Sequence, residues 1–375
     1  MKLRIAMVGA CPYPAPQGSQ VLMRNTADCF HRLGHDVHLV VYGYGAAPER
    51  DPWAVHRAAR IPFASKTAPG PSLMKPLQDV TLAAVLRRVI RQQHVDVVCA
   101  HNYEALLAAL LVGKRPILYF AHNSMAEELP YFLGWEWATG TAGGLLDKYF
   151  PRRADKVIVP HHRLAGHLVV RGCRQEQVVI VPPPLDGTPF RTVPVDSASV
   201  PAVIYAGNVD PYQNLSLLLA AAQVLKRKKP GIKLLIGTAA QACIPGAEIV
   251  PVHDLEGLSQ FLARDAVFAV PRVSWSGYPM KILNAMAAGK AVVACESAAY
   301  PITHDETGLV VPDDDVDAYA AALLRLVEDQ HLREKLGSQA RQVVLERHQP
   351  NMVARQLETL MLEAHDRYNT RVRTV

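Results

Sequence analysis

Short apolar runs alternate with segments of helical periodicity along most of this 375-residue chain. The runs at residues 202–206 and 266–270, for example, are apolar throughout, which indicates strands buried on both faces of a sheet. Buried strands joined by helices form parallel sheets, so the pattern predicts an α/β protein. The alternation occurs twice, before and after a proline-rich break that begins with Val181-Pro182-Pro183-Pro184.

This break divides the chain into two doubly wound domains of similar size, because such a segment continues neither a helix nor a central strand. We expect a first domain over residues 1–181, a linker over 182–200, a second domain over 201–349 and a final helix over 350–375. In each domain, ligands are expected at the carboxyl ends of the parallel strands.

The apolar pattern also predicts the individual elements. In the first domain the expected strands are residues 3–8, 36–41, 96–100, 116–121, 156–159 and 178–181, and the expected helices are 20–33, 80–93, 103–112 and 161–171. In the second domain the expected strands are 202–206, 233–237, 248–251, 266–270 and 291–294, and the expected helices are 215–226, 255–263 and 280–288. From 316 to about 371 we expect helix interrupted near Asp329 and at Pro350.

Two segments, 44–75 and 123–150, show no readable pattern and are interpreted as loops that bind a substrate. The second contains Trp135 and Trp137, which either stack on sugar or lipid or pack inside the protein. The apolar run before Cys11 superficially resembles a lipoprotein signal, but prolines follow at once, and a first buried strand explains it better. No run approaches the length of a membrane-spanning helix.

The net charge of +6, from 40 basic and 34 acidic residues, fits nucleic acid, an anionic membrane or a phosphorylated substrate. The tight basic cluster at 226–229 ends a helix, where cations complement the dipole, and no nucleic-acid motif accompanies it. We therefore expect no nucleic-acid partner. Arg87, Arg88 and Arg91 form either a solvated helix face or a contact with an anionic membrane. Six scattered cysteines without a CxxC pair fit a reducing cytosol.

Two loops of the first domain are candidate sites. In the first, Gly18 and Ser19 open a helix, whose free N–H groups suit an anion, although Ser19 is equally readable as an ordinary helix cap. The loop lacks the GxGxxG pattern of dinucleotide binding. In the second, His122 directly follows a buried strand, where a catalytic residue would project into the cleft. The alternative is a histidine that local loop hydrogen bonds satisfy.

The second domain has two further candidate loops. Gly207 follows its first strand and permits either a plain tight turn or close approach of a ligand. Downstream, Pro279 suits the first position of a helix that Gly289 ends. Lys281 and Asn284 share a face near the start of that helix, which favours a diphosphate site, although a solvated surface is the alternative.

No metal site is expected. The run Asp313-Asp314-Asp315 resembles a DxD metal motif, but its place before a long helix favours an N-cap cluster. The pair His161-His162 has no partners at metal-ligand spacing.

Four segments together resemble the GT-B glycosyltransferases, specifically glycosyltransferase family 4. They are "GSQVLMRNTADCFHRLGHDVHLVV", "RRADKVIVP" with "VVIVPPPLD", "YAGNVDPYQNLSLLLAA", and "SGYPMKILNAMAAGKAVVA" with "ETGLVVPDDDVDAYAAALLRLVED". The resemblance implies two Rossmann-like domains facing a cleft, with the nucleotide in the second and the acceptor mostly in the first. It also implies a metal-independent, retaining transfer from a nucleotide-sugar, and a final helix that crosses back to the first domain.

The resemblance and the loops above give a set of expected site residues. The expected catalytic residues are His122 and Lys281. The expected donor-binding residues are Gly18, Ser19, Gly207, Asn208, Gln213, His253, Asp254, Ser276, Gly277, Tyr278, Pro279, Met280 and Asn284.

Four positions depart from the family pattern. Ser276 and Asn284 stand where the family has two glutamates, and Asn208 and Gln213 stand where it has an arginine and a lysine that grip the diphosphate. Lys281 is the nearest substitute cation. The changes indicate either a subgroup with a rearranged donor site or an inactive relative.

We therefore expect a glycosyltransferase that uses a UDP- or GDP-sugar and a glycan or lipid-linked acceptor, with no metal or other cofactor. The expected location is cytoplasmic, with the inner face of the cell membrane as an option. A non-catalytic GT-B subunit is the main alternative, and a nucleotide-sugar epimerase is a further one.

Overall fold

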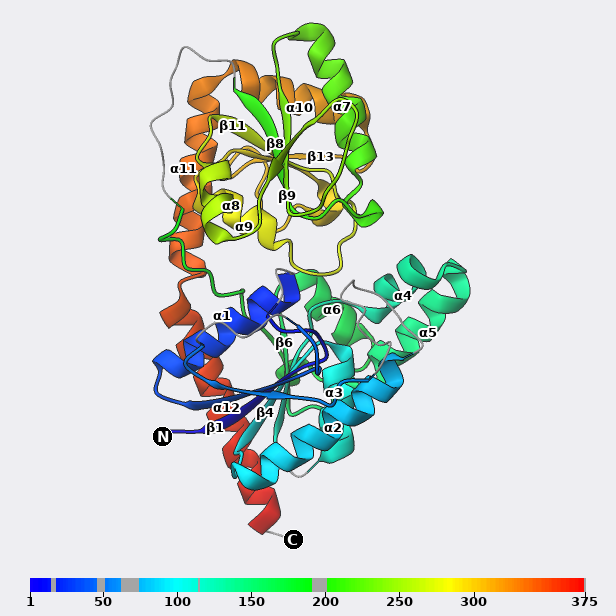
Figure 1. The fold of residues 1–375 in the computed structure, drawn as a ribbon, viewed down its shortest axis with the longest axis vertical. Helices are drawn as coiled ribbons and strands as arrows, with labels where there is room; N and C mark the ends of the chain where they lie inside the picture. The colour runs from blue at the N-terminus through cyan, green and yellow to red at the C-terminus, as the bar shows by residue number, and fades with distance from the viewer. Residues whose placement is uncertain (15–17, 46–50, 62–73, 114, 191–200, 374–375) are drawn as a thin grey trace. The chain divides into compact units, whose positions relative to one another are not determined.

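The computed structural model describes residues 1–14, 18–45, 51–61, 74–113, 115–190 and 201–373 (Figure 1). The chain forms two compact units. The first comprises Met1–Pro184, Ser276–Tyr278 and Pro350–Val375, and the second comprises Leu185–Trp275 and Pro279–Gln349. Each unit holds one parallel sheet, which confirms the expected α/β fold class. Part of the predicted linker, 191–200, lies outside the described residues.

Among the described residues, the sheet of the first unit has seven parallel strands in the order β3-β2-β1-β4-β5-β6-β7 (Figure 1). Side chains along the central strands are buried, because helices cover both faces. Because the strands run parallel, their carboxyl ends lie at one edge of the sheet. The strands are β1 Arg4–Gly9, β2 Asp36–Val41, β3 Ala54–Arg57, β4 Val97–His101, β5 Ile117–Phe120, β6 Lys156–Val159 and β7 Val178–Ile180.

The final helix belongs to the first unit, where it lies against α1 and the sheet (Figure 1). Leu357 and Met361 of this helix join one buried apolar cluster with Phe30 of α1 and with Ile5 and Met7 of β1. The helices of this unit are α1 Gly18–Arg32, α2 Lys75–Gln92, α3 Tyr103–Val112, α4 Met125–Leu133, α5 Glu136–Tyr149, α6 His162–Val170 and α12 Pro350–Arg373.

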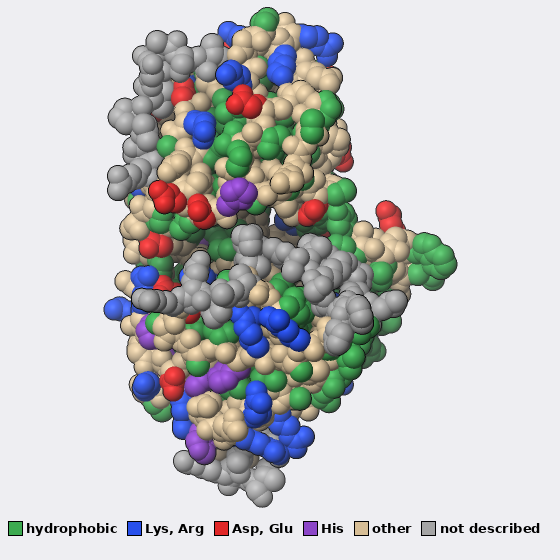
Figure 2. Space-filling model, viewed as in Figure 1, with side chains coloured by type: hydrophobic (Ala, Val, Ile, Leu, Met, Phe, Trp, Pro, Cys, Tyr) green, Lys and Arg blue, Asp and Glu red, His purple; other side chains and the backbone are tan. Residues whose placement is uncertain are grey.

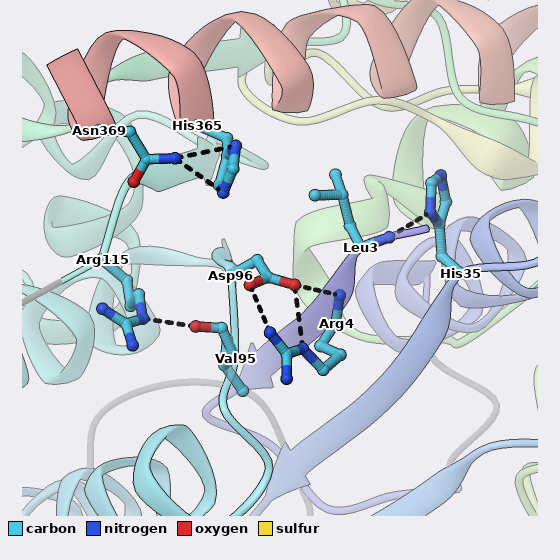
Figure 3. Close-up of polar contacts among 8 residues, drawn as sticks. All are labelled: Leu3, Arg4, His35, Val95, Asp96, Arg115, His365 and Asn369. Carbon is cyan, nitrogen blue, oxygen red and sulfur yellow. Dashed lines mark hydrogen bonds and ion pairs between the residues drawn. The ribbon is translucent and has the colours of Figure 1, made fainter. Parts of the chain in front are cut away.

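Side-chain bonds fix the amino-terminal ends of neighbouring strands (Figure 3). The Asp96 carboxylate, before β4, accepts a bond from the backbone N–H of Arg4 at 2.9 Å and bonds from its guanidinium at 3.0 and 3.1 Å. Burial opposes the charged form of Asp96, but the bonds from Arg4 outweigh it and hold the pKa of this carboxyl below its usual range. The backbone N–H of Leu3 donates to Nδ1 of His35 at 3.1 Å.

The interpretation of residues 123–150 as a loop is wrong, because α4 and α5 form a helical hairpin there. The helical period is obscured by Pro130 inside α4 and by a glycine-rich α5. Gly143 has a packing role, since an added Cβ would overlap the backbone of Met125 in the first turn of α4. The buried Asp147 of α5 also accepts bonds from the backbone N–H groups of Met125 at 3.0 Å and Ala126 at 3.2 Å.

The segment 44–75 was also expected to be a loop, but part of it forms β3, which pairs with β2 at the edge of the sheet. A four-residue edge strand with half-exposed side chains has too little apolar pattern to be recognised. The rest of that segment includes 46–50 and 62–73, which lie outside the described residues.

Within its described residues, the second unit has a six-stranded parallel sheet in the order β10-β9-β8-β11-β12-β13. Helices α7 and α10 share a buried apolar cluster with Tyr205 and Val267 of the central strands. The elements are β8 Ala202–Ala206, α7 Leu215–Lys228, β9 Leu234–Thr238, β10 Glu248–Pro251, α8 Leu255–Leu262, β11 Ala266–Val270, α9 Met280–Ala287, β12 Val292–Cys295, β13 Leu309–Val311, α10 Val316–Glu328 and α11 Gln330–Arg347.

Both interruptions predicted in the helical tail are confirmed. Asp329 ends α10 and caps α11, accepting a bond from the backbone N–H of Leu332 at 2.8 Å. Pro350 begins α12, where its missing N–H is not needed. The predicted aspartate cap is confirmed too, since Asp315 accepts a bond from the backbone N–H of Ala318 at 2.8 Å.

We expect Gly143→Val to destabilise the first unit by about 1–3 kcal/mol, because the added carbons overlap the backbone of α4. Gly140→Ala is the matched control in the same helix, since its Cβ would meet its nearest atom, Cγ of Pro130, at an ordinary 3.6 Å. Urea unfolding measures both variants. Equal midpoints for Gly143→Val and Gly140→Ala would contradict this packing role.

Candidate functional site

Gly207 turns the chain at the carboxyl end of β8. Its φ is +137°, and its backbone N–H donates to the carbonyl of Gly237 at 2.9 Å. A Cβ at this position would lie 3.1 Å from Nζ of Lys281. Glycine therefore allows both the turn and the close approach of the lysine.

Lys281, in the first turn of α9, is half-buried and bonded to neutral groups. Its Nζ donates to the hydroxyl of Tyr205 at 2.7 Å and to Oε1 of Gln213 at 2.5 Å, and it lies 4.4 Å from the centroid of the Tyr205 ring. Burial and then repulsion from Arg272 lower the pKa of this lysine to about 7. A bound anion would raise the pKa of this lysine and so favour its protonated form.

Arg272 is a second cation at this edge, and the sequence analysis missed it. It follows β11 by two residues, is buried, and lies with its guanidinium carbon 4.3 Å from the centroid of the Tyr212 ring. The Tyr212 hydroxyl in turn lies 3.0 Å from Oγ of Ser274. The available signal was a charged residue directly after an apolar strand, at the edge where ligands of parallel sheets bind.

The two positions that lack the family's cations lie beside this pair. Gln213 is buried and accepts the bond from Lys281. Asn208 uses its side-chain amide to bond Asp210, while its carbonyl accepts a bond from the Tyr205 hydroxyl at 2.6 Å. Both residues thus belong to the network around the lysine.

Two of the expected donor-binding residues, His253 and Asp254, lie at the start of α8. Asp254 caps this helix, with Oδ1 accepting a bond from the backbone N–H of Gly257 at 2.7 Å. His253 is exposed beside it. A contact of either residue with a nucleotide stays a prediction.

The segment before α9 is divided between the units. Ser276, Gly277 and Tyr278 cluster with the first unit, where Oγ of Ser276 accepts a bond from the backbone N–H of Ser124 at 2.7 Å. Gly277 has a φ of +82°. Pro279 is the N-cap of α9, whereas the sequence predicted it at the first helical position.

Met280 is therefore the first residue of α9, and Lys281 and Asn284 follow within it. Asn284 is half-buried. The predicted helix and its shared Lys281–Asn284 face are thus present, and their contacts with a donor stay a prediction.

In the first unit, His122 pairs with a second histidine that the sequence analysis missed. Nε2 of His122 lies 3.2 Å from Nδ1 of His101, the last residue of β4. The His101 ring stacks on Phe120 at 4.3 Å between centroids, and its Nε2 is buried without a hydrogen-bond partner among the described residues. The bond of His122 is thus to a neighbouring strand rather than within its own loop.

Burial lowers the pKa of His122 to about 4 and that of His101 well below its usual value. Both rings are therefore neutral near pH 7. One proton lies between the two facing nitrogens, so one ring donates and the other accepts.

At the first loop, α1 begins at Gly18, so Ser19 is its second residue rather than its cap. The preceding residues, 15–17, lie outside the described residues. His161, one of the pair dismissed as metal ligands, caps α6 by accepting a bond from the backbone N–H of Leu164 at 3.2 Å. Across the described parts of the chain, no three His, Cys, Asp or Glu side chains are placed to hold a metal ion.

The two halves of the chain match two domain families. Residues 16–188 match the description Glycosyltransferase Family 4, and residues 200–329 match Glycosyl transferases group 1. The chain is a family 4 glycosyltransferase of the GT-B fold.

Similar proteins are distant in sequence. Phosphatidyl-myo-inositol mannosyltransferase of Mycolicibacterium smegmatis is 24% identical to this glycosyltransferase, covering 88% of this chain and 86% of its own. Sucrose-phosphate synthase from Thermosynechococcus elongatus gives a TM-score of 0.82 at 18% identity, over 96% of this chain and 99% of its own. Anabaena HepE in complex with UDP-glucose gives 0.73 at 17% identity, over 96% and 99%. These structures establish the fold.

No helix among the described residues of this glycosyltransferase is long and apolar enough to cross a membrane.

We expect the imidazoles of His101 and His122 to stay neutral from about pH 7 to about pH 5.5, because burial holds both pKa values below that range. Nitrogen-15 spectra of the wild type and of His122→Gln, which identifies the His122 signals, measure this. Titration of His122 near pH 6.5 would contradict the buried pair.

Proposed function

We propose that this glycosyltransferase moves a sugar from a UDP- or GDP-sugar to a hydroxyl of a glycan or lipid-linked acceptor, with retention of configuration and without a metal. The observation that carries the proposal is the placement of Lys281 and Arg272 at the carboxyl edge of the second sheet, around Gly207. HepE, with the same fold, is known in complex with UDP-glucose.

The two cations supply the charge that Asn208 and Gln213 lack. Lys281 bonds neutral oxygens, and Arg272 lies close enough to lower its pKa. A diphosphate placed between them relieves this repulsion and accepts charge-assisted hydrogen bonds, each contributing about 1.5–3 kcal/mol. The rearranged site can therefore hold a diphosphate without the family's usual arginine and lysine.

The same contacts would assist the reaction. As the glycosidic bond to the diphosphate breaks, negative charge grows on the leaving oxygen, and fixed cations stabilise that charge. In the retaining mechanism that the family resemblance implies, this oxygen takes the proton of the attacking acceptor hydroxyl on the same face of the sugar. A neutral His122 can hydrogen-bond a sugar hydroxyl and so orient the donor.

We expect Lys281→Ala and Arg272→Ala each to lower donor binding or turnover by about tenfold to a hundredfold, because each removes a charged partner of the diphosphate. His122→Gln should lower turnover. Lys229→Ala is the control, since this exposed residue pairs with Glu328 at 3.1 Å in the same unit. Transfer and hydrolysis assays with UDP- and GDP-sugars measure all four.

Three results of these assays decide between the alternatives. Unchanged turnover in Lys281→Ala would contradict the proposed donor site. Absence of both turnover and nucleotide binding in calorimetry would favour the non-catalytic subunit, because tight nucleotide binding argues against it. Donor interconversion without acceptor would favour an epimerase. The anomeric configuration of the product tests retention, and activity in the presence of EDTA tests metal independence.

We also expect nucleoside diphosphate binding to take up about 0.9 proton at about pH 8, because the free lysine has a pKa of about 7 and the bound anion raises it toward 10.5. Affinity should accordingly fall by up to about tenfold per pH unit above pH 7. Calorimetry in buffers of different ionisation enthalpy measures the uptake. The same uptake in Lys281→Met would overturn the assignment to this lysine.

A further inference from the structure

The turn between α4 and α5 exposes two tryptophans. Trp135 is 87% exposed and Trp137 is 84% exposed, and Leu133 beside them is 54% exposed. Figure 2 shows hydrophobic side chains gathered at the end of the projecting hairpin that Figure 1 labels α4 and α5. The alternative that these tryptophans pack inside the protein is therefore wrong. A cluster of large exposed apolar side chains marks an interaction surface.

The base of this hairpin is held in place. Asp147 accepts a bond from Oγ of Ser124 at 2.8 Å, besides those from the start of α4, and its Oδ2 lies 2.9 Å from Nε2 of His167. Gly143 brings α5 into direct contact with the backbone of α4. The tip thus presents its aromatic rings from a fixed support, so little conformational entropy is lost when a partner binds.

Three cations lie on or beside this hairpin. Lys148 of α5 and Arg152 just beyond it both lie over the Tyr149 ring, at 5.6 and 5.1 Å from its centroid. The guanidinium of Arg171 packs against Gly144, and a Cβ added at this glycine would overlap it. None of the three cations forms an ion pair with a residue that the structure describes.

A shallow hollow of about 500 Å³ connects the aromatic and basic parts of this surface. Its lining includes Trp137, Leu145, Lys148 and Arg171, with Glu136 as the acidic member. The surface therefore combines amphipathic indole rings, an aliphatic side chain and cations that form no ion pair with a described residue.

This combination fits an anionic bilayer surface. Tryptophan rings are stable at the boundary between headgroups and acyl chains, and each basic residue near anionic lipid contributes about 1 kcal/mol. A second copy of this chain is a poorer partner, since a twofold contact would set the cations against one another.

We propose that the α4–α5 hairpin docks on an anionic membrane, with Trp135 and Trp137 in the interface and Lys148, Arg152 and Arg171 against lipid phosphates. Docking would bring the enzyme to a lipid-linked acceptor, so this role rests on the proposed function. The other basic surface considered, Arg87, Arg88 and Arg91 of α2, is exposed, but the sequence places no aromatic residue among these arginines.

The test uses the full chain, without nucleotide, and vesicles of phosphatidylcholine with or without phosphatidylglycerol. We expect flotation with the anionic vesicles and a blue shift of tryptophan emission. Trp135→Ser/Trp137→Ser should remove both, and the emission of Trp53 and Trp275 then serves as the internal reference. Lys148→Gln/Arg152→Gln/Arg171→Gln should weaken binding to the anionic vesicles by about a hundredfold.

Two control variants match these changes elsewhere in the first unit. Leu111→Ser removes a leucine that is 74% exposed on α3, and Arg87→Gln/Arg88→Gln/Arg91→Gln removes three cations from α2. Both should bind vesicles as the wild type does. Flotation that fails for the wild type, that survives in the tryptophan variant, or that is lost in the α2 variant would overturn the proposal.

Two further measurements separate this role from its rivals. Self-association that Trp135→Ser/Trp137→Ser abolishes, in sedimentation without vesicles, would overturn the proposal in favour of a second copy as partner. Transfer to a soluble acceptor should be unchanged in that variant. Loss of vesicle binding with intact transfer in this variant would therefore show that the hairpin acts in membrane binding alone. Absence of transfer in the wild type would instead contradict the proposed function.

Discussion

Burial of both faces of each sheet is the constraint on which the rest of the structure depends. Strands such as β8 and β11 are apolar along their length, so both faces of the sheet must be covered, and helices that connect parallel strands provide this cover. Parallel order brings all the carboxyl ends to one edge. His101 and His122 therefore lie together at this edge of the first sheet, and Gly207 and Arg272 lie at this edge of the second sheet, although the members of each pair are distant in sequence.

The proposed donor site, at the carboxyl edge of the second sheet, has cations at other positions than the family pattern. Asn208 and Gln213 lack the cations of the family pattern, but Lys281 and Arg272 reach the same edge from α9 and from the end of β11. Gln213 occupies the position of the family's lysine and accepts a hydrogen bond from Lys281, the nearest substitute cation. Burial and repulsion from Arg272 leave Lys281 easy to deprotonate, so we expect an anion between the two cations to stabilise this arrangement.

Much of the fold could be predicted because apolar periodicity reports burial directly. Strands β2, β6 and β11 and helix α3 have the predicted bounds, and the breaks at Asp329 and Pro350 are present. The α4–α5 hairpin was missed because it is held by Gly143 and Asp147, which act through close backbone contact and capping rather than through an apolar stripe. His101 and Arg272 were missed because their roles depend on neighbours from other strands and loops.

The sequence by itself determined two parallel α/β units, most of their elements and the glycosyltransferase family, since these follow from local pattern and motif. Tertiary structure decided which charges meet at the donor edge, that His122 is paired with His101, and that Trp135 and Trp137 face outward. The physical reason is that hydrogen bonds, repulsion between charges and exposure depend on distances across the sheet, and local sequence pattern carries no information about such distances.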